Sequence, residues 1–216
     1  MPAKFDRSLL PARPELSFEE SLWGRGIRYV AGIDEAGRGA LAGPVAAAAL
    51  ILPAEPTIAE QLSGVRDSKQ MSPAERELWA MRLPRLAASL GLGFATHTEI
   101  DELGIVPAVR LAIRRALESL DIQPEHLLVD YLELPDYPMP QSALVKGDAR
   151  CLSIAAASIM AKTARDDVMK KLETEFPGYG FGAHKGYGTL AHRQAIHRLG
   201  LSPVHRRTFK VKEPGE

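Results

Sequence analysis

Cysteine is almost absent from this chain of 216 residues, which has a single one at Cys151. One cysteine excludes an internal disulfide framework and a cysteine-rich zinc site, and it suits a reducing compartment, so we expect the cytoplasm. Long apolar runs are lacking too, since no stretch approaches the roughly 18 residues that cross a bilayer. Residues 1–10 also lack the apolar centre of a signal peptide. The sequence therefore predicts a protein that is neither inserted in a membrane nor exported.

An excess of charge of one sign is also lacking, because 27 Lys and Arg balance 27 Asp and Glu. A net charge of zero gives no overall field toward nucleic acid, so any binding of a polyanion must come from a local basic patch. The apolar and charged fractions, 45% and 25%, are ordinary for a globular protein with a substantial core. Charge and composition alone therefore indicate no partner.

The chain divides into a leader and one domain. Residues 1–17 carry three prolines among polar residues, and we expect an extended or poorly ordered leader outside the core. Residues 18–216 are predicted to form a single domain, with a C-terminal helical extension from about residue 175.

Apolar runs and helix signals predict the elements of this domain. Strands are expected at 29–34, 44–52, 90–97, 127–130 and 143–145, the first two pairing antiparallel. Helices are expected from the capping box at 72–75 to near Pro84, from Pro107 to 120, over 152–176, and from Thr189 to Gly200, with a Gly-rich loop at 177–188. This order predicts an α/β fold in which a mixed sheet is flanked by helices.

Two adjacent carboxylates, Asp34 and Glu35, end the apolar run of the first expected strand, and a Gly-Arg-Gly turn at 37–39 comes next. Side chains alternate along a strand, so both carboxylates can serve one site only if the strand ends or twists there. The glycines permit that turn and a close approach of backbone N–H groups to a ligand, and Arg38 suits phosphate. Taken alone, the octapeptide is equally consistent with a surface Asp-Glu pair that opens a polar loop.

Two further carboxylates, Asp130 and Asp148, also end or follow expected strands. Together with Asp34 and Glu35 they could hold Mg²⁺ or Mn²⁺, which prefer oxygen ligands. Two such ions about 4 Å apart can activate water and stabilise the leaving oxygen of a phosphodiester. Carboxylates packed together without cations would repel and take up protons, so a real cluster implies metal. Taken singly, Asp130 and Asp148 are equally consistent with turn residues.

Other polar residues have plainer interpretations. Four histidines, at 184, 192, 197 and 205, are irregularly spaced and have no cysteine beside them, so we do not expect a zinc site. The remaining aspartates considered are interpreted as caps or exposed charges: Asp101, Asp121, Asp136, Asp166 and Asp167.

Several motifs occur together in the order and approximate spacing of one known family. They are GIDEAGRG at 32–39, DSK at 67–69, LVD at 128–130, KGD at 146–148, AAASI at 155–159 with AK at 161–162, RD at 165–166 and HKGYGT at 184–189. Across residues 29–209 the chain resembles ribonuclease HII, the type 2 ribonuclease H. The resemblance implies an RNase H-like mixed sheet with antiparallel first strands flanked by helices, plus a C-terminal helical segment that leans over the substrate. In one departure, Tyr131 stands where the family often has a small residue, which leaves the local turn open.

The resemblance also implies an activity. Such an enzyme is an endoribonuclease that hydrolyses the RNA strand of RNA-DNA hybrids and cuts 5′ of single ribonucleotides in duplex DNA. It uses two metal ions, Mg²⁺ or Mn²⁺, and leaves 5′-phosphate and 3′-hydroxyl ends. We therefore expect RNA-DNA hybrid and ribonucleotide-containing duplex DNA as partners, no membrane, and a monomer.

The family's site residues map onto this chain by motif. Its catalytic, metal-binding acids correspond to Asp34, Glu35, Asp130 and Asp148. Its substrate-binding residues correspond to Gly37, Arg38 and Gly39, which would contact the 2′-hydroxyl of the ribonucleotide, with Tyr187 beside them. A tyrosine there can pack against the next deoxyribose while its phenol bonds the ribose hydroxyl. Lys69 would contact phosphate, and Lys185 or Lys162 could add further backbone contacts.

Three alternatives stay open at this point. Ribonuclease HIII shares the first motif but has an N-terminal substrate-binding domain, and fewer than 30 residues precede the first expected strand here. A DNA-directed phosphoryl transferase of the same broad fold would differ in cutting an all-DNA duplex. A hybrid-binding module without activity is disfavoured, because polyanion binding gains nothing from four unneutralised carboxylates.

Overall fold

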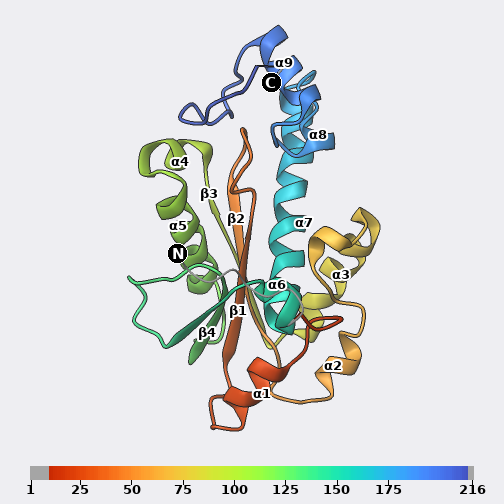
Figure 1. The fold of residues 1–216 in the computed structure, drawn as a ribbon, viewed down its shortest axis with the longest axis vertical. Helices are drawn as coiled ribbons and strands as arrows, with labels where there is room; N and C mark the ends of the chain where they lie inside the picture. The colour runs from red at the N-terminus through yellow and green to blue at the C-terminus, as the bar shows by residue number, and fades with distance from the viewer. Residues whose placement is uncertain (1–9, 214–216) are drawn as a thin grey trace.

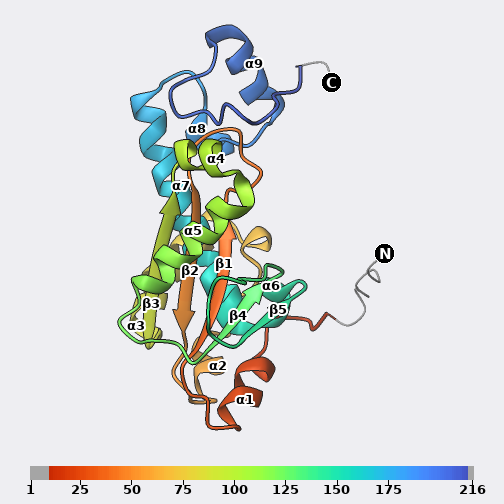
Figure 2. The same ribbon diagram turned by 90° about the vertical axis from the view of Figure 1, so that its left-hand side faces the viewer.

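A five-stranded mixed sheet forms the centre of the molecule (Figures 1 and 2), in a computed structural model that describes residues 10–213. The strand order is β3-β2-β1-β4-β5. The first three strands pair antiparallel, and the last two run parallel to β1. Their bounds are β1 (Val30–Ala36), β2 (Val45–Ile51), β3 (Ser89–Ala95), β4 (His126–Asp130) and β5 (Gln141–Leu144). The predicted α/β fold, with its antiparallel first strands, is confirmed.

Helices cover both faces of the sheet. One core lies between the sheet and α5 (Ile105–Glu118), and the other lies between the sheet and α7 (Leu152–Glu175) with α3 (Pro73–Leu86). Small residues let α7 approach closely: a Cβ on Gly32 of β1 would lie 2.3 Å from the carbonyl carbon of Ser153. The Ala-rich first half of α7 is therefore held tightly against the strand that carries Asp34.

The predicted helix ends mostly agree with the structure. Ser72 and Glu75 form the expected capping box of α3, which ends at Leu86, just beyond Pro84. Thr189 caps α9 (Leu190–Leu199) as expected. The fifth helix begins at Ile105 rather than at Pro107, since a proline is tolerated anywhere in the first turn, where no N–H is needed.

Several short elements were not predicted. They are α1 (Ser17–Trp23), α2 (Ile58–Gln61), the 3-10 turn η2 (Ser68–Gln70), α4 (His97–Leu103), α6 (Gly147–Arg150) and α8 (Phe181–His184). The expected third strand extended to His97, but a capping box between Thr96 and Glu99 starts α4 there. The expected loop at 177–188 contains α8, and β1 continues past Asp34 because Glu35 and Ala36 pair with β2.

The expected leader belongs partly to the core. Residues 1–9 lie outside the described residues, but Leu16 is only 4% exposed and packs in the core. Glu15 pairs with Cys151 beside the start of α7, and Glu19 of α1 is buried with a carboxylate oxygen 2.7 Å from the Ser153 amide nitrogen. Excluding the whole leader from the core was therefore wrong for Leu16, because the residues around it pack against the N-terminal end of α7.

The C-terminal part lies beyond one end of the sheet. The long α7 extends past the strands, and α8, α9 and the last described residues gather around its far end, next to α4 (Figures 1 and 2). Within residues 10–213, no helix is both long enough and apolar enough to cross a membrane.

Candidate active site

Three of the four predicted carboxylates converge at one place. One oxygen each from Asp34, Asp130 and Asp148 lies within 4.8 Å of the other two. The strands explain the first pair: β1 and β4 are parallel neighbours with Ile33 opposite Val129, so Asp34 and Asp130 come next at the same level. Asp148 arrives on α6, directly after Gly147, whose amide donates a hydrogen bond of 2.7 Å to Asp130 Oδ1.

Glu35 lies at the margin of this cluster. It is not one of the three converging carboxylates, and its Oε1 lies 3.8 Å from Arg38 Nη1. It nevertheless lines the same cavity as Asp34 and Asp130, and its side chain is only 14% exposed. The strand β1 does not end between the two adjacent carboxylates but continues to Ala36. Both carboxylates nevertheless line one cavity.

The cluster favours protons when no cation is present. Burial raises the pKa of Asp34 well above its usual value, and the charges of Glu35 and Asp130 raise it further. Burial and the charge of Asp148 likewise raise the pKa of Asp130, although the Gly147 amide lowers it. Burial and the charge of Asp130 raise the pKa of Glu35. Oxygen acceptors that repel one another in this way suit a hard divalent cation.

Two serines and a lysine support the cluster. Ser158 of α7 hydrogen bonds to Asp34, and its Oγ lies 2.8 Å from Ser68 Oγ of η2. Next to Ser68, Lys69 Nζ lies 2.8 Å from Asp148 Oδ2, although the lysine side chain is 71% exposed. Partial burial lowers the pKa of Lys69, but the hydrogen bond to Asp148 and its charge raise it more. The lysine predicted to contact phosphate therefore stands at the edge of the acidic cluster.

The Gly-Arg-Gly turn and Tyr187 line the same cavity as the acids. Gly37 has a left-handed φ of 93°, and a Cβ there would lie 1.9 Å from Arg165 Nε, so only glycine fits. Ala40, just after the turn, forms an isolated antiparallel bridge with Tyr187. The cavity measures about 240 Å³ and is lined by Asp34, Glu35, Ala36, Gly37, Arg38, Gly39, Ser68, Lys69, Asp130, Ser158, Lys162 and Tyr187.

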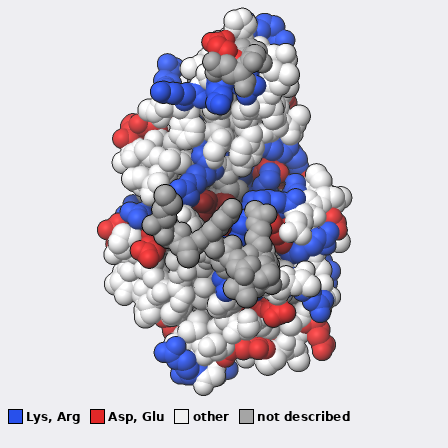
Figure 3. All heavy atoms as spheres, in the orientation of Figure 1, with Lys and Arg blue, Asp and Glu red and all other residues white. Residues whose placement is uncertain are grey.

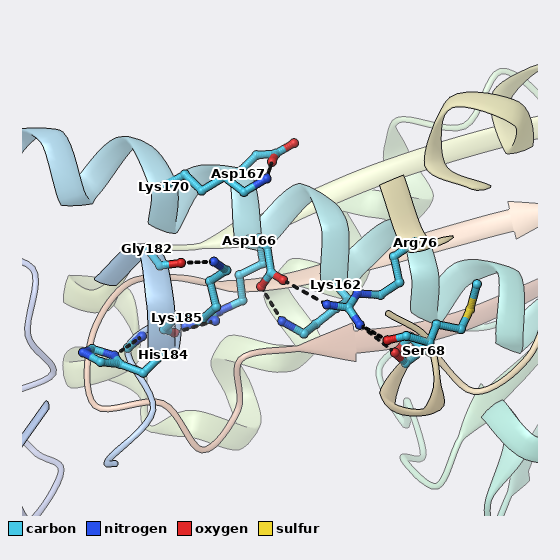
Figure 4. A network of polar contacts seen from close by, with 12 residues as sticks. Ser68, Arg76, Lys162, Asp166, Asp167, Lys170, Gly182, His184 and Lys185 are labelled. Carbon is cyan, nitrogen blue, oxygen red and sulfur yellow. Dashed lines mark hydrogen bonds and ion pairs between the residues drawn. The ribbon is translucent and has the colours of Figure 1, made fainter. Parts of the chain in front are cut away.

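Of the two other lysines predicted to contact the substrate backbone, Lys162 lines the cavity with the acids and Lys185 does not. Lys162 lines this cavity and bonds to Asp166, whereas Lys185 lines the neighbouring groove and its Nζ donates to the Gly182 carbonyl (Figure 4). Asp166 is only 7% exposed, and Arg76 Nη2 lies 3.8 Å from it. The interpretation of Asp166 as a cap or exposed charge was wrong, because it pairs with two cations beside the site.

Sequence reasoning gave no role to Ser158, Arg165 or Arg206. Ser158 lies within a quoted motif, but an Ala/Ser-rich helix face indicates close packing rather than a hydrogen bond to a carboxylate. Arg165 and Arg206 are both buried, and their guanidinium groups bond to backbone carbonyl oxygens around the Gly-Arg-Gly turn. No spacing rule reveals such contacts, because their partners are backbone atoms far away in the sequence.

This sheet, with carboxylates from its adjacent strands β1 and β4 meeting a third from α6, defines the class of metal-dependent nucleases with an RNase H-like fold. The family model described as Ribonuclease HII matches residues 31–212. The chain belongs to the ribonuclease HII family. This membership confirms the resemblance found in the motifs, makes the chain an endoribonuclease of the hydrolase class, and answers the ribonuclease HIII alternative.

Individual relatives agree with the family match. The Ribonuclease HII of Dehalococcoides mccartyi (strain ATCC BAA-2266 / KCTC 15142 / 195) is 51% identical over 197 residues, which cover 91% of this chain and 92% of the relative. The ribonuclease H2 of Pyrococcus horikoshii OT3 shares the fold with a TM-score of 0.67 and 29% identity, covering 84% of this chain and 94% of that one. The RNase HII in a PCNA complex from Archaeoglobus fulgidus gives a TM-score of 0.72 and 25% identity, covering 86% and 96%.

Proposed function

We propose that this chain hydrolyses the RNA strand of RNA-DNA hybrids and also cuts duplex DNA on the 5′ side of a single ribonucleotide, leaving 5′-phosphate and 3′-hydroxyl ends. One observation carries the proposal. A single cavity is lined both by carboxylates and by the Gly-Arg-Gly turn with Tyr187. Phosphodiester hydrolysis and recognition of a ribose would therefore occur side by side.

Asp34, Glu35, Asp130 and Asp148 would hold Mg²⁺ or Mn²⁺. The donor set fits such ions, since three carboxylate oxygens lie within 4.8 Å of one another, and burial and mutual repulsion raise the pKa values of Asp34 and Asp130. When bound, two ions would supply an activated water and stabilise the leaving oxygen. Glu35 would complete the ligand set from the margin of the cluster.

The other residues of the cavity would select and orient the substrate. Lys69 holds the Asp148 carboxylate through its Nζ and presents positive charge where a phosphate would approach. Gly39 has no side chain that would keep the backbone away from a ribose, and a Cβ there would meet open space, whereas the missing Cβ of Gly37 leaves room for Arg165. Among the described residues the Tyr187 hydroxyl has no hydrogen-bond partner, which leaves it available for the 2′-hydroxyl that separates RNA from DNA.

The surface supports binding of a polyanion despite the zero net charge. Lys and Arg side chains gather around a small acidic area near the middle of one face (Figure 3). Such a surround would attract the phosphates on either side of the scissile bond while the acids hold the ions. We propose RNA-DNA hybrid and ribonucleotide-containing duplex as partners of a monomer that acts in the cytoplasm, where its buried free Cys151 would stay reduced.

End mapping on an RNA-DNA hybrid tests the reaction. The purified chain is incubated with hybrid labelled on the RNA strand, with Mg²⁺, with Mn²⁺ and with EDTA, beside an all-DNA duplex. We expect metal-dependent cuts in the RNA strand only, with 5′-phosphate and 3′-hydroxyl ends. Cyclic phosphate ends, or equal cutting of the all-DNA duplex, would contradict the proposal.

A further inference from the structure

The segment after α9 packs against the residues that follow the Gly-Arg-Gly turn and is linked by hydrogen bonds to Tyr187. This segment, residues 202–208, is called the C-terminal strap below. Its backbone pairs with the residues that follow the turn: the amide of Arg206 donates to the Leu41 carbonyl over 2.9 Å, and the amide of Gly43 donates to the Val204 carbonyl over 2.9 Å. At its far end the backbone amides of Arg207 and Thr208 both donate to the carboxylate of Asp101 on α4.

Arg206 of the strap holds the Gly-Arg-Gly turn by its backbone. The side chain is 1% exposed, and Nη2 and Nη1 donate to the carbonyl oxygens of Gly37 and Arg38 over 2.8 and 3.0 Å. The same guanidinium bonds to the carbonyl oxygens of Gly43 and Pro44. Burial and the charge of Arg165 lower its pKa to about 9, so it remains charged at neutral pH. One rigid fork thus ties the backbone of Gly37 and Arg38 to that of Gly43 and Pro44, which the single nitrogen of a lysine could not do.

The neighbouring residue, His205, connects the strap to Tyr187 through His192. The Ser202 amide donates to His205 Nδ1 over 2.9 Å, so the His205 proton lies on Nε2. That Nε2 lies 3.0 Å from His192 Nε2, which must therefore accept, and His192 Nδ1 donates to the Tyr187 carbonyl over 3.0 Å. A chain of hydrogen bonds with defined direction runs from the strap to the backbone of Tyr187.

The rings of His192 and His205 are both neutral at pH 7. Burial, together with the charge of the neighbouring His184, lowers the pKa of His192 and of His205 to about 4. His184 stacks on His192 with ring centroids 4.2 Å apart. A neutral His192 can accept from His205 and donate to Tyr187 at the same time, which a doubly protonated ring could not do.

We propose that the C-terminal strap is a positioning element that sets the Gly37-Arg38 backbone against Tyr187, through Arg206 on one side and through His205 and His192 on the other. This inference rests on the proposed role of these residues in reading the ribose. The strap bonds to none of the converging carboxylates, so its loss should impair substrate selection rather than metal binding. Arg165 of α7 also joins the two halves, through the carbonyls of Ala42 and Lys185, so the fold keeps a second connection.

A matched pair of arginine variants tests the proposal. R206Q removes the buried fork, whereas R207Q removes the same charge from the exposed neighbour. Each is assayed for thermal unfolding, for Mn²⁺ binding by calorimetry, and for kcat and KM on a DNA duplex with one ribonucleotide and on a continuous RNA-DNA hybrid. We expect R206Q to lose about tenfold to a hundredfold in kcat/KM on the single ribonucleotide, the loss that follows a misplacement near 1 Å. The hybrid should suffer less, because it offers a 2′-hydroxyl at every register, and Mn²⁺ affinity and R207Q should match the wild type.

A pair of histidine variants tests the second arm and covers the case in which R206Q fails to fold. H205Q keeps an N–H donor near the position of Nε2, and H205F keeps the ring without it. H205Q should retain more single-ribonucleotide cleavage than H205F at equal activity on hybrid. Equal cleavage by both, or a folded R206Q whose ratio between the two substrates equals that of the wild type, overturns the proposal. If the wild type itself does not prefer the ribonucleotide-containing duplex to all-DNA duplex, the proposed function fails instead.

Discussion

Replacing Asp130 by asparagine should stabilise the metal-free protein while it abolishes cleavage. Asp130 is one of three carboxylates whose oxygens lie within 4.8 Å of one another. Its Oδ1 accepts the Gly147 amide over 2.7 Å, a bond that an asparagine oxygen can keep. The substitution therefore removes one negative charge from the cluster with little change of shape.

The expected gain follows from the repulsion removed. Two unit charges at the 4.8 Å limit of this cluster interact by about 3.5 kcal/mol at an effective dielectric constant of about 20. Protonation and solvent relieve part of this repulsion in the wild type, so we expect a net gain of about 1 to 2 kcal/mol, or about 2 to 8 °C in Tm for a chain of this size. Loss of a metal ligand should lower the cleavage rate by about 10³-fold, equivalent to about 4 kcal/mol.

The stability that the Asp130→Asn variant gains over the wild type should grow with pH. Burial and the charge of Asp148 raise the pKa of Asp130 above its usual value of 3.8, so the folded protein binds this proton more tightly than the unfolded chain. The folded state is therefore favoured below the unfolded pKa, and this advantage is lost as the pH rises through the folded pKa. The substituted asparagine carries no such penalty, so the difference in Tm should be larger at pH 8 than at pH 5.

Thermal unfolding in EDTA at both pH values measures the effect. Asp136→Asn is the matched control, since Asp136 is exposed and outside the cluster. Millimolar Mg²⁺ or Mn²⁺ should raise the Tm of the wild type and of this control more than that of the Asp130 variant, because only a folded site binds the ion. A variant that is no more stable than the wild type in EDTA at pH 8, or that cleaves hybrid within about tenfold of it, would refute the account of the cluster.

Three further predictions follow from other parts of the structure. Tyr187→Ala should reduce cleavage at a single ribonucleotide by about tenfold or more and leave Mn²⁺ affinity unchanged; equal cleavage of that duplex by mutant and wild type in steady-state assays would contradict the role of the ring. Gly32→Ala should destabilise the protein by about 1 to 3 kcal/mol, because its Cβ would lie 2.3 Å from backbone of Ser153, and an unchanged urea midpoint would show that α7 can move away at no cost. His192 and His205 have pKa values lowered from 6.5 to about 4, so their contribution to stability should be full above pH 6.5 and lost toward pH 4 as unfolding takes up protons; in saturating Mg²⁺, which keeps the carboxylate cluster ionised, unfolding free energies that are flat over this window would show that these rings are not buried as neutral groups.

The parts of the fold that sequence predicted have local signals. Pro44 and Pro53 bracket β2, the Ser72-Glu75 capping box starts α3, and apolar residues at helical spacing define α5. The short helices have no such signal, because a single turn shows no periodicity. Helix α1 depends instead on tertiary contact: its Glu19 carboxylate accepts the Ser153 amide at the start of α7.

The residues of the candidate site likewise divide into those with a local sequence signal and those without one. Carboxylates at strand ends pointed to Asp34, Asp130 and Asp148 because neighbouring strands bring their ends together. The pairing of Lys69 with Asp148 depends on how η2 packs against α7, which no short-range pattern encodes. The pairing of Asp166 with Lys162 did have a local signal, since Lys162 precedes it by one helical turn on the same face.

The central claim is that one cavity both cuts the phosphodiester and checks for a ribose. The most direct measurement uses one DNA duplex made in three versions, with ribose, 2′-fluoro or 2′-deoxy sugar at a single position, and follows Mg²⁺- or Mn²⁺-dependent cleavage at that position. The account predicts a cut on the 5′ side of the ribose and little or none in the other two, since only the ribose offers the 2′-hydroxyl to the Gly37–Gly39 turn and Tyr187. Equal cleavage of all three versions, or none of the ribose version with active metal present, would contradict it.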